Sequence, residues 1–445
     1  MIKQISVSLC LLVSISIQAQ HTFSVKEAQE YGLQLNREML NATLDVEIAS
    51  KQMKETISVG LPQVNLEGQW QKFLTVPTTL VPADAFGPLP ENADGSNKFA
   101  EMQFGLPHTT SATVTASQLI FNGSYIVGLK AAKSFMTFSR LTRDLTENQI
   151  NDSITTAYYN VLLVKENSAF LKSIVEVHTT LVEEIEAQHK AGFVEDIEVD
   201  RMALVLSKMK MQYDNMYRRE ELSEAYLKLM LGIPLEENLS LSDSLPQLLE
   251  ASTNFSLEES NIKQRIEYKM AAMKVELKEL DLRRYQTDKL PSIAAFGTVN
   301  TSSMGNEFTA FESGSRWYPS QMIGLKISVP IFDGLGGSAR IQKARLVWEQ
   351  AKNDKLHIEE SLTLAHLNAQ SEFLNSVSDY SHQENNLALS KRIYRKTLAK
   401  YKEGLVSSLE LSQAGTDYLQ SNTNFSKSIY DLLITNLNYQ RSLGK

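Results

Sequence analysis

The period of the apolar residues changes along the chain, and each change predicts a different element. Residues 25–58 contain no proline and one glycine, which predicts a helix. After Leu61-Pro62 apolar and polar residues alternate over 64–71. Similar alternation occurs over 111–117 and 325–331, and an apolar run over 293–301 is a weaker strand. This pattern predicts about four strands of roughly ten residues, which is long enough to cross a bilayer in a barrel.

Alternation of this kind is also typical of a two-layer sheet with one hydrated face, so the strands alone leave both interpretations open. The helical segments distinguish them better. Between Gly123 and Ala191 there is one further glycine and no proline, which predicts a helix of nearly 70 residues, or about 100 Å. A second such helix is expected from about Ser338 to Lys402, followed by a last helix with a near-heptad apolar stripe. Helices this long need partner helices along their length.

Three landmarks occur twice in the same order, which indicates a tandem repeat. The pairs are Leu61-Pro62 with Leu290-Pro291, Phe121-Asn122-Gly123 with Phe332-Asp333-Gly334, and Ala191-Gly192-Phe193-Val194 with Glu403-Gly404-Leu405-Val406. We expect a first repeat at 20–240, a linker at 241–256 and a second repeat at 257–445. The first repeat carries about 18 extra residues within 76–108, a proline-rich segment that predicts a loop.

The N-terminus resembles a secretory signal peptide. Lys3 precedes an apolar run of about 13 residues that ends near Ala19, which is too short for a membrane helix. A buried N-terminal helix is the alternative. Cleavage after Ala19 would remove Cys10, the single cysteine of the chain. The mature protein would then use neither disulfides nor thiol chemistry.

Composition and charge exclude several classes of function. The net charge of −8 argues against a nucleic-acid-binding protein. The seven histidines show no metal-ligand spacing, and the carboxylates form no paired acid–base site, so neither a metal nor a catalytic activity is expected. Residues 334–339 fit a G-x-G-x-x-A string, but Pro330 interrupts the preceding strand and the matching junction after Asn122 lacks the glycines. No cofactor is expected.

The duplicated landmarks together resemble the TolC family of outer-membrane efflux ducts, over roughly residues 22–445. The resemblance implies a mostly helical protein with transmembrane β-structure. Three chains would form a 12-stranded barrel that a helical tunnel continues into the periplasm. It further implies a homotrimer in the outer membrane of a Gram-negative bacterium, embedded in outer-membrane lipid. Such a trimer is the exit duct for a tripartite efflux pump or a type I secretion system, with a periplasmic adaptor and an inner-membrane pump as partners. A soluble periplasmic coiled-coil scaffold is the competing hypothesis.

The resemblance also assigns roles to individual residues. Tyr401, Glu198 and Glu410 match gate positions of the family, whereas Val406 and Gln413 replace a gating arginine and a second acidic residue. The two helix turns would form the tip that contacts the adaptor, through Gly192, Phe193, Gly404 and Leu405. The strand–helix junctions are Asn122, Gly123, Asp333 and Gly334, where Asn122 and Asp333 suit an N-cap and the glycines suit a tight turn.

Overall fold

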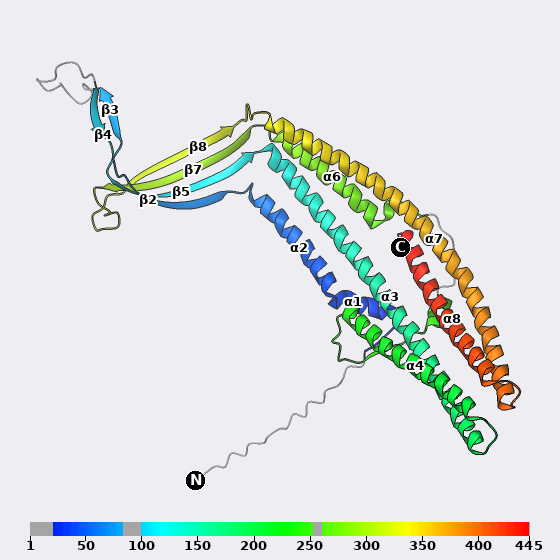
Figure 1. Cartoon of the computed structure of the whole chain (residues 1–445). Coiled ribbons are helices and arrows are strands. Elements are labelled where there is room, and N and C mark those ends of the chain that lie inside the picture. Colours follow the sequence, from blue (N-terminus) through cyan, green and yellow to red (C-terminus); the bar gives the residue numbers. More distant parts are fainter. Residues whose placement is uncertain (1–20, 83–98, 252–259, 445) are drawn as a thin grey trace, which may run out of the picture. The chain divides into compact units, whose positions relative to one another are not determined.

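The computed structural model describes residues 21–82, 99–251 and 260–444, so the expected signal peptide lies outside the described residues (Figure 1). The chain forms two compact units. Unit 1 comprises Met1–Glu47, Phe138–Met273 and Asn353–Lys445, and unit 2 comprises Ile48–Thr137 and Lys274–Lys352. Each unit therefore takes residues from both predicted repeats.

Helices account for most of the described chain. They are α1 (Val25–Leu35), α2 (Arg37–Ser58), α3 (Gly123–Lys190), α4 (Asp196–Leu231), α5 (Leu245–Ala251), α6 (Ile266–Thr287), α7 (Gly336–Lys402) and α8 (Ser408–Ser442). The predicted long helices correspond to α3, with 68 residues, and α7, with 67 residues. The mostly helical class that the sequence predicted is confirmed.

Unit 2 contains a four-stranded antiparallel sheet in the order β2-β5-β7-β8 (Figure 1). Its strands are β2 (Gln63–Lys72), β5 (His108–Phe121), β7 (Ser292–Gly305) and β8 (Tyr318–Ser328). The four predicted strands are confirmed; β2, β5 and β7 are longer than predicted, and β8 both begins and ends earlier than predicted. Two of them come from each half of the chain, and β2 and β8 form the edges.

The register of this sheet separates an apolar face from a polar face. One row across the four strands contains Val64, Ala116, Gly297 and Ile323. A row of the opposite face contains Glu67, Thr113, Asn300 and Ser320. In this polar row Asn300 Nδ2 donates a 2.6 Å hydrogen bond to Thr113 Oγ1. One face of the sheet therefore suits an apolar environment and the other suits water.

Two predictions about unit 2 were wrong in detail. The segment 76–108 is more than a loop, because β3 (Thr78–Pro82) and β4 (Phe99–Gln103) pair in an antiparallel hairpin. The alternation expected to reach residue 331 ends earlier, since β8 stops at Ser328. Pro330 lies two residues further on and has no N–H to donate to a ladder.

The helix predicted over 25–58 is broken at Asn36, which separates α1 from α2. Asn36 has ψ 127°, outside the helical region. Its side chain compensates for the break. Oδ1 accepts a 2.8 Å hydrogen bond from the Glu38 N–H, and Nδ2 donates a 2.9 Å hydrogen bond to the Met230 carbonyl. An asparagine can replace the lost backbone bonds in this way, which propensity alone does not reveal.

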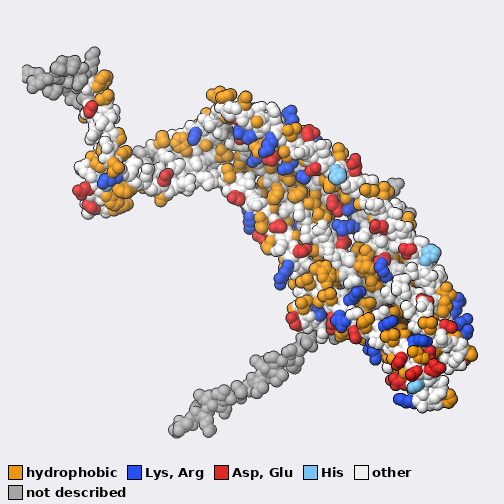
Figure 2. Space-filling model, viewed as in Figure 1, with side chains coloured by type: hydrophobic (Ala, Val, Ile, Leu, Met, Phe, Trp, Pro, Cys, Tyr) orange, Lys and Arg blue, Asp and Glu red, His pale blue; other side chains and the backbone are white. Residues whose placement is uncertain are grey.

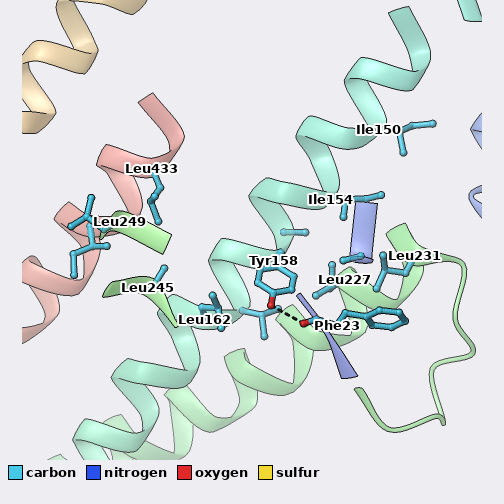
Figure 3. Packing of buried hydrophobic residues seen from close by; sticks show 14 of the residues in the cluster. Phe23, Ile150, Ile154, Tyr158, Leu162, Leu227, Leu231, Leu245, Leu249 and Leu433 are labelled. Carbon is cyan, nitrogen blue, oxygen red and sulfur yellow. Dashed lines mark hydrogen bonds between the residues drawn. The ribbon is translucent and has the colours of Figure 1, made fainter. Parts of the chain in front are cut away.

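The core of unit 1 joins the start of the chain to the segment after α4 (Figure 3). The short strands β1 (His21–Phe23) and β6 (Leu239–Leu241) pair in parallel. The buried Tyr158 hydroxyl donates a 2.8 Å hydrogen bond to the Phe23 carbonyl and lies 3.1 Å from Asp243 Oδ2. Within the segment predicted as a linker over 241–256, residues 245–251 form α5, which inserts Leu245 and Leu249 into this core; residues 252–256 lie outside the described residues.

His178 of α3 is completely buried, and neither ring nitrogen has a hydrogen-bond partner. An added Cβ on Gly415 would lie 3.6 Å from its Nε2, so α8 packs closely against the ring. Burial lowers the pKa of His178 from the ordinary 6.5. The unfolded chain therefore binds a proton that the folded chain excludes as the pH falls below 6.5.

We expect the stability of the protein to fall in this acidic range, by at most about 1.4 kcal/mol per pH unit for this single group. His178→Leu should flatten that dependence. The check is the midpoint of thermal unfolding of the purified protein at several pH values between neutral and mildly acidic. His382→Gln, at an exposed position of α7, is the matched control and should keep the wild-type slope. An unchanged slope in His178→Leu would contradict the assignment.

Candidate functional site at the helix turns of unit 1

The two helix hairpins of unit 1 reverse through turns of the same design. In the α3–α4 turn Gly192 has φ 84°, its N–H donates to the His189 carbonyl, and the Phe193 N–H donates to the Gln188 carbonyl. In the α7–α8 turn Gly404 has φ 72°. Its N–H donates to the Tyr401 carbonyl, and the Leu405 N–H donates to the Lys400 carbonyl. Each pair of bonds is a Schellman motif, which satisfies the last carbonyls of the helix and requires a left-handed residue. A glycine adopts that conformation without strain.

Ion pairs and hydrogen bonds bring the two hairpins together near these turns. Lys402 Nζ lies 3.6 Å from Glu184 Oε1, which joins the end of α7 to the end of α3. Arg201 Nη1 lies 3.5 Å from Ser408 Oγ, which joins the start of α4 to the start of α8. Phe193 is 84% exposed and Leu405 is 67% exposed. The four predicted tip residues therefore lie in two adjacent turns that present bare apolar side chains to solvent.

The structure brings two of the three predicted gate residues together. Tyr401 is half-buried against an apolar cluster of α3, α4, α7 and α8. Burial, and then the negative charge of Glu198, raise the pKa of the Tyr401 hydroxyl. Glu198 itself pairs with Arg201, one helical turn along α4, at 2.8 Å. Glu410 lies on the exposed first turn of α8, where its N–H donates a 3.3 Å hydrogen bond to Ser407 Oγ.

Two polar residues near these positions were missed by the sequence reasoning. Arg201 connects Glu198 of α4 to Ser408 of α8 through its guanidinium group. Its i,i+3 spacing from Glu198 was the signal that could have found it. Asp417 is the second: its Oδ1 accepts a 2.9 Å hydrogen bond from Gln413 Nε2, so a carboxylate lies one helical turn beyond Gln413.

The two strand–helix junctions of unit 2 differ from one another. Asn122 immediately precedes α3, and its Oδ1 accepts a 2.9 Å hydrogen bond from the Tyr125 N–H. Gly123 does not adopt a positive φ; an added Cβ would lie 2.9 Å from the Thr287 carbonyl oxygen, so its constraint is space and not a tight turn. Gly334 does adopt a left-handed conformation, with φ 67°. Asp333 precedes it, and its Oδ2 accepts a 2.5 Å hydrogen bond from the Gly337 N–H in the first turn of α7.

Among the helices of residues 21–82, 99–251 and 260–444, none combines the length and the apolar character that crossing a bilayer requires. Within the same described residues, no group of His, Cys, Asp and Glu side chains could hold a metal ion.

The fold is shared with outer-membrane channels of known structure. The chain superposes on the CmeC outer membrane channel of Campylobacter jejuni with a TM-score of 0.74 and 18% identity, covering 94% of this chain and 85% of that chain. The MtrE outer membrane channel of Neisseria gonorrhoeae, in its open state, gives a TM-score of 0.72 at 18% identity, covering 94% and 88%. CusC gives 0.74 at 16% identity, covering 94% and 92%. The chain therefore shares the fold of these channels.

The second half of the chain also matches a family model. Residues 260–445 match the model of the outer membrane efflux protein family. Comparison of the sequence with curated proteins gives no significant match. The family model thus matches the second half of the chain, and the likeness to the solved channels extends over most of the chain as a likeness of fold.

Proposed function

We propose that three copies of this chain form the outer-membrane exit duct of a tripartite efflux or type I secretion machine. The duct conducts its cargo passively, while an inner-membrane pump drives transport and a periplasmic adaptor engages the helix turns. The family match supports the channel class. The observation that carries the proposal for this chain is the sheet with one apolar and one polar face, whose two edges β2 and β8 pair with no further strand among the described residues.

Closing the sheet follows from its topology. An exposed strand edge presents a row of unpaired N–H and C=O groups. No such edge can stay unpaired in hydrocarbon, so a sheet that faces lipid must close on itself. Strands β2 and β8 run in opposite directions, since three antiparallel pairings separate them. Three copies would therefore close into a uniformly antiparallel ring of 12 strands, to which each of the repeats 20–240 and 257–445 contributes two strands and one helix hairpin.

In the same proposal the turns of unit 1 form the gate and the adaptor contact. Tyr401, Glu198 and Arg201 form one cluster that joins the two hairpins, and its rearrangement would accompany opening. Glu410 and Asp417 lie on exposed positions of α8 and would add carboxylates to the wall of the pore, which favours cations. The bare side chains of Phe193 and Leu405 suit an apolar groove on an adaptor.

Membrane fractionation tests this function against the scaffold hypothesis. The duct requires that the protein fractionate with the outer membrane and migrate as a trimer only when detergent is present. Deletion of the gene should also raise intracellular retention of pump substrates, and the intact gene should reverse the effect. A monomer that remains in the periplasmic extract without detergent would overturn the proposal.

A further inference from the structure

A cavity lies beside the junction between β8 and α7 in unit 2. Its volume is about 330 Å³, and it is formed by the end of α6, the segment 330–335 and the first turn of α7. The side chains that matter to its chemistry are Tyr285, Asp288, Lys289, Phe332, Asp333 and Arg340. None of these residues belongs to the turns of unit 1.

The charges around this cavity are balanced. Lys289 and Arg340 supply two positive charges, and Asp288 and Asp333 supply two negative ones. Arg340 Nη2 lies 3.2 Å from Asp333 Oδ2, which also holds the first turn of α7. A lining without net charge discriminates against a simple anion. It suits a ligand that carries both signs, with a phosphate near the two cations and an ammonium near Asp288.

An apolar surface leads into the same cavity. Ile331 is 94% exposed and Phe332 is 81% exposed, and Leu335 is exposed in a left-handed conformation with φ 69°. Among the described residues, Leu335 is the one non-glycine with positive φ. Figure 2 shows hydrophobic and basic side chains side by side where the strands give way to helices. Covering such exposed apolar side chains with an apolar partner lowers the free energy of the system.

The position of this surface identifies the partner. Ile323, Leu325 and Ile327 lie in alternate positions of β8 on the apolar face of the sheet, and the exposed side chains of Ile331 and Phe332 lie three and four residues after the end of the strand. In the duct, that face contacts hydrocarbon, so the junction lies at the level of the periplasmic leaflet's headgroups. Basic and aromatic side chains are the residues that anchor proteins at this level.

We propose that the cavity binds one phosphatidylethanolamine molecule of the periplasmic leaflet per chain. The phosphate lies between Lys289 and Arg340, the ammonium faces Asp288, and the acyl chains cover Ile331, Phe332 and the apolar row of β8. This site rests on the proposed function, because it requires the sheet to lie in a membrane. It would fix the strand–helix junction at a defined depth in the bilayer.

The test is native mass spectrometry of the detergent-extracted, delipidated trimer after addition of phosphatidylethanolamine or phosphatidylglycerol. We expect preferential retention of phosphatidylethanolamine, up to one molecule per chain. Lys289→Glu should lower that retention at least about tenfold, because it replaces an ionic hydrogen bond by a repulsion. Asp288→Lys should reverse the preference toward phosphatidylglycerol. Lys396→Glu, at an exposed position of α7 in unit 1, is the matched control and should bind as the wild type does.

Equal retention of phosphatidylethanolamine by wild type and Lys289→Glu would overturn the site, and so would a wild-type preference for phosphatidylglycerol. If Lys289→Glu instead releases monomers without changing lipid retention, the surface is a contact between copies of the chain, and the proposal fails. None of these results contradicts the proposal that the protein is an outer-membrane duct. A wild-type protein that does not fractionate with the outer membrane would overturn the duct itself, which is a distinguishable outcome.

Discussion

Replacing both Phe193 and Leu405 by aspartate is expected to abolish export while leaving the trimer assembled. The two side chains protrude from adjacent turns of unit 1 and contribute little to its core, so their loss should not unfold the chain. In the proposed duct they enter an apolar groove of the adaptor. A carboxylate in such a groove would be desolvated without a partner, which costs several kcal/mol and lowers adaptor affinity at least about a hundredfold.

The measurement is the minimum inhibitory concentration of pump substrates in a strain that lacks the native gene. The double variant should behave like the deletion strain, and the conservative variant Phe193→Tyr with Leu405→Met should restore resistance. Heat-modifiable migration of the trimer serves as the folding control. If the double aspartate variant forms a normal trimer and still confers resistance, the turns are not the adaptor contact.

Alanine at two glycines of α3 is expected to change stability in opposite directions. At Gly123 a methyl group would lie 2.9 Å from both the carbonyl oxygen and the Cβ of Thr287, so the junction must shift. Overpacking of this kind costs about 1–3 kcal/mol, more than the helix propensity gained. At Gly128 no atom lies within 4 Å of the added Cβ, so the same substitution should stabilise α3 by up to about 1 kcal/mol.

Thermal unfolding of the two purified variants gives the comparison directly. Gly123→Ala should lower the unfolding midpoint and the yield of trimer, whereas Gly128→Ala should raise the midpoint and leave the yield unchanged. Because the substitution and the helix are the same, differences in expression or detergent do not explain opposite signs. A midpoint for Gly123→Ala equal to that of the wild type would contradict the close packing of α3 against the end of α6.

Much of this fold could be predicted from residue pattern because its elements are long and regular. The scarcity of glycine and proline between 123 and 190 was sufficient to predict α3, and alternation was sufficient for β2 and for the central part of β5. The errors occurred where side chains replace backbone bonds or where prolines are dense. Asn36 caps α2 through its own amide, and the hairpin of β3 and β4 forms within the proline-rich segment.

The candidate site was predictable only where a motif imposes a backbone conformation. Gly192 and Gly404 could be located because a helix reversal needs a left-handed residue. The proximity of Tyr401 to Glu198, and the bridge from Arg201 to Ser408, depend on two hairpins that are far apart in sequence. The cavity at Lys289 and Arg340 likewise combines α6 with α7, and no local pattern marks it.

The trimeric duct makes one demand that cysteine cross-linking can test directly: β2 of one chain must pair with β8 of another. We would place one cysteine at Gln69 in β2 and a second at each position of 319–327 in β8, in a Cys10→Ser background. Paired strands bring Cα atoms within the 4.4–6.8 Å that a disulfide needs at about one or two positions of such a scan. Covalent dimers and trimers should then appear on a non-reducing gel at those positions, and not when the first cysteine is placed at Thr113 of β5. Monomers at every position of the β8 scan would contradict the closed three-chain sheet.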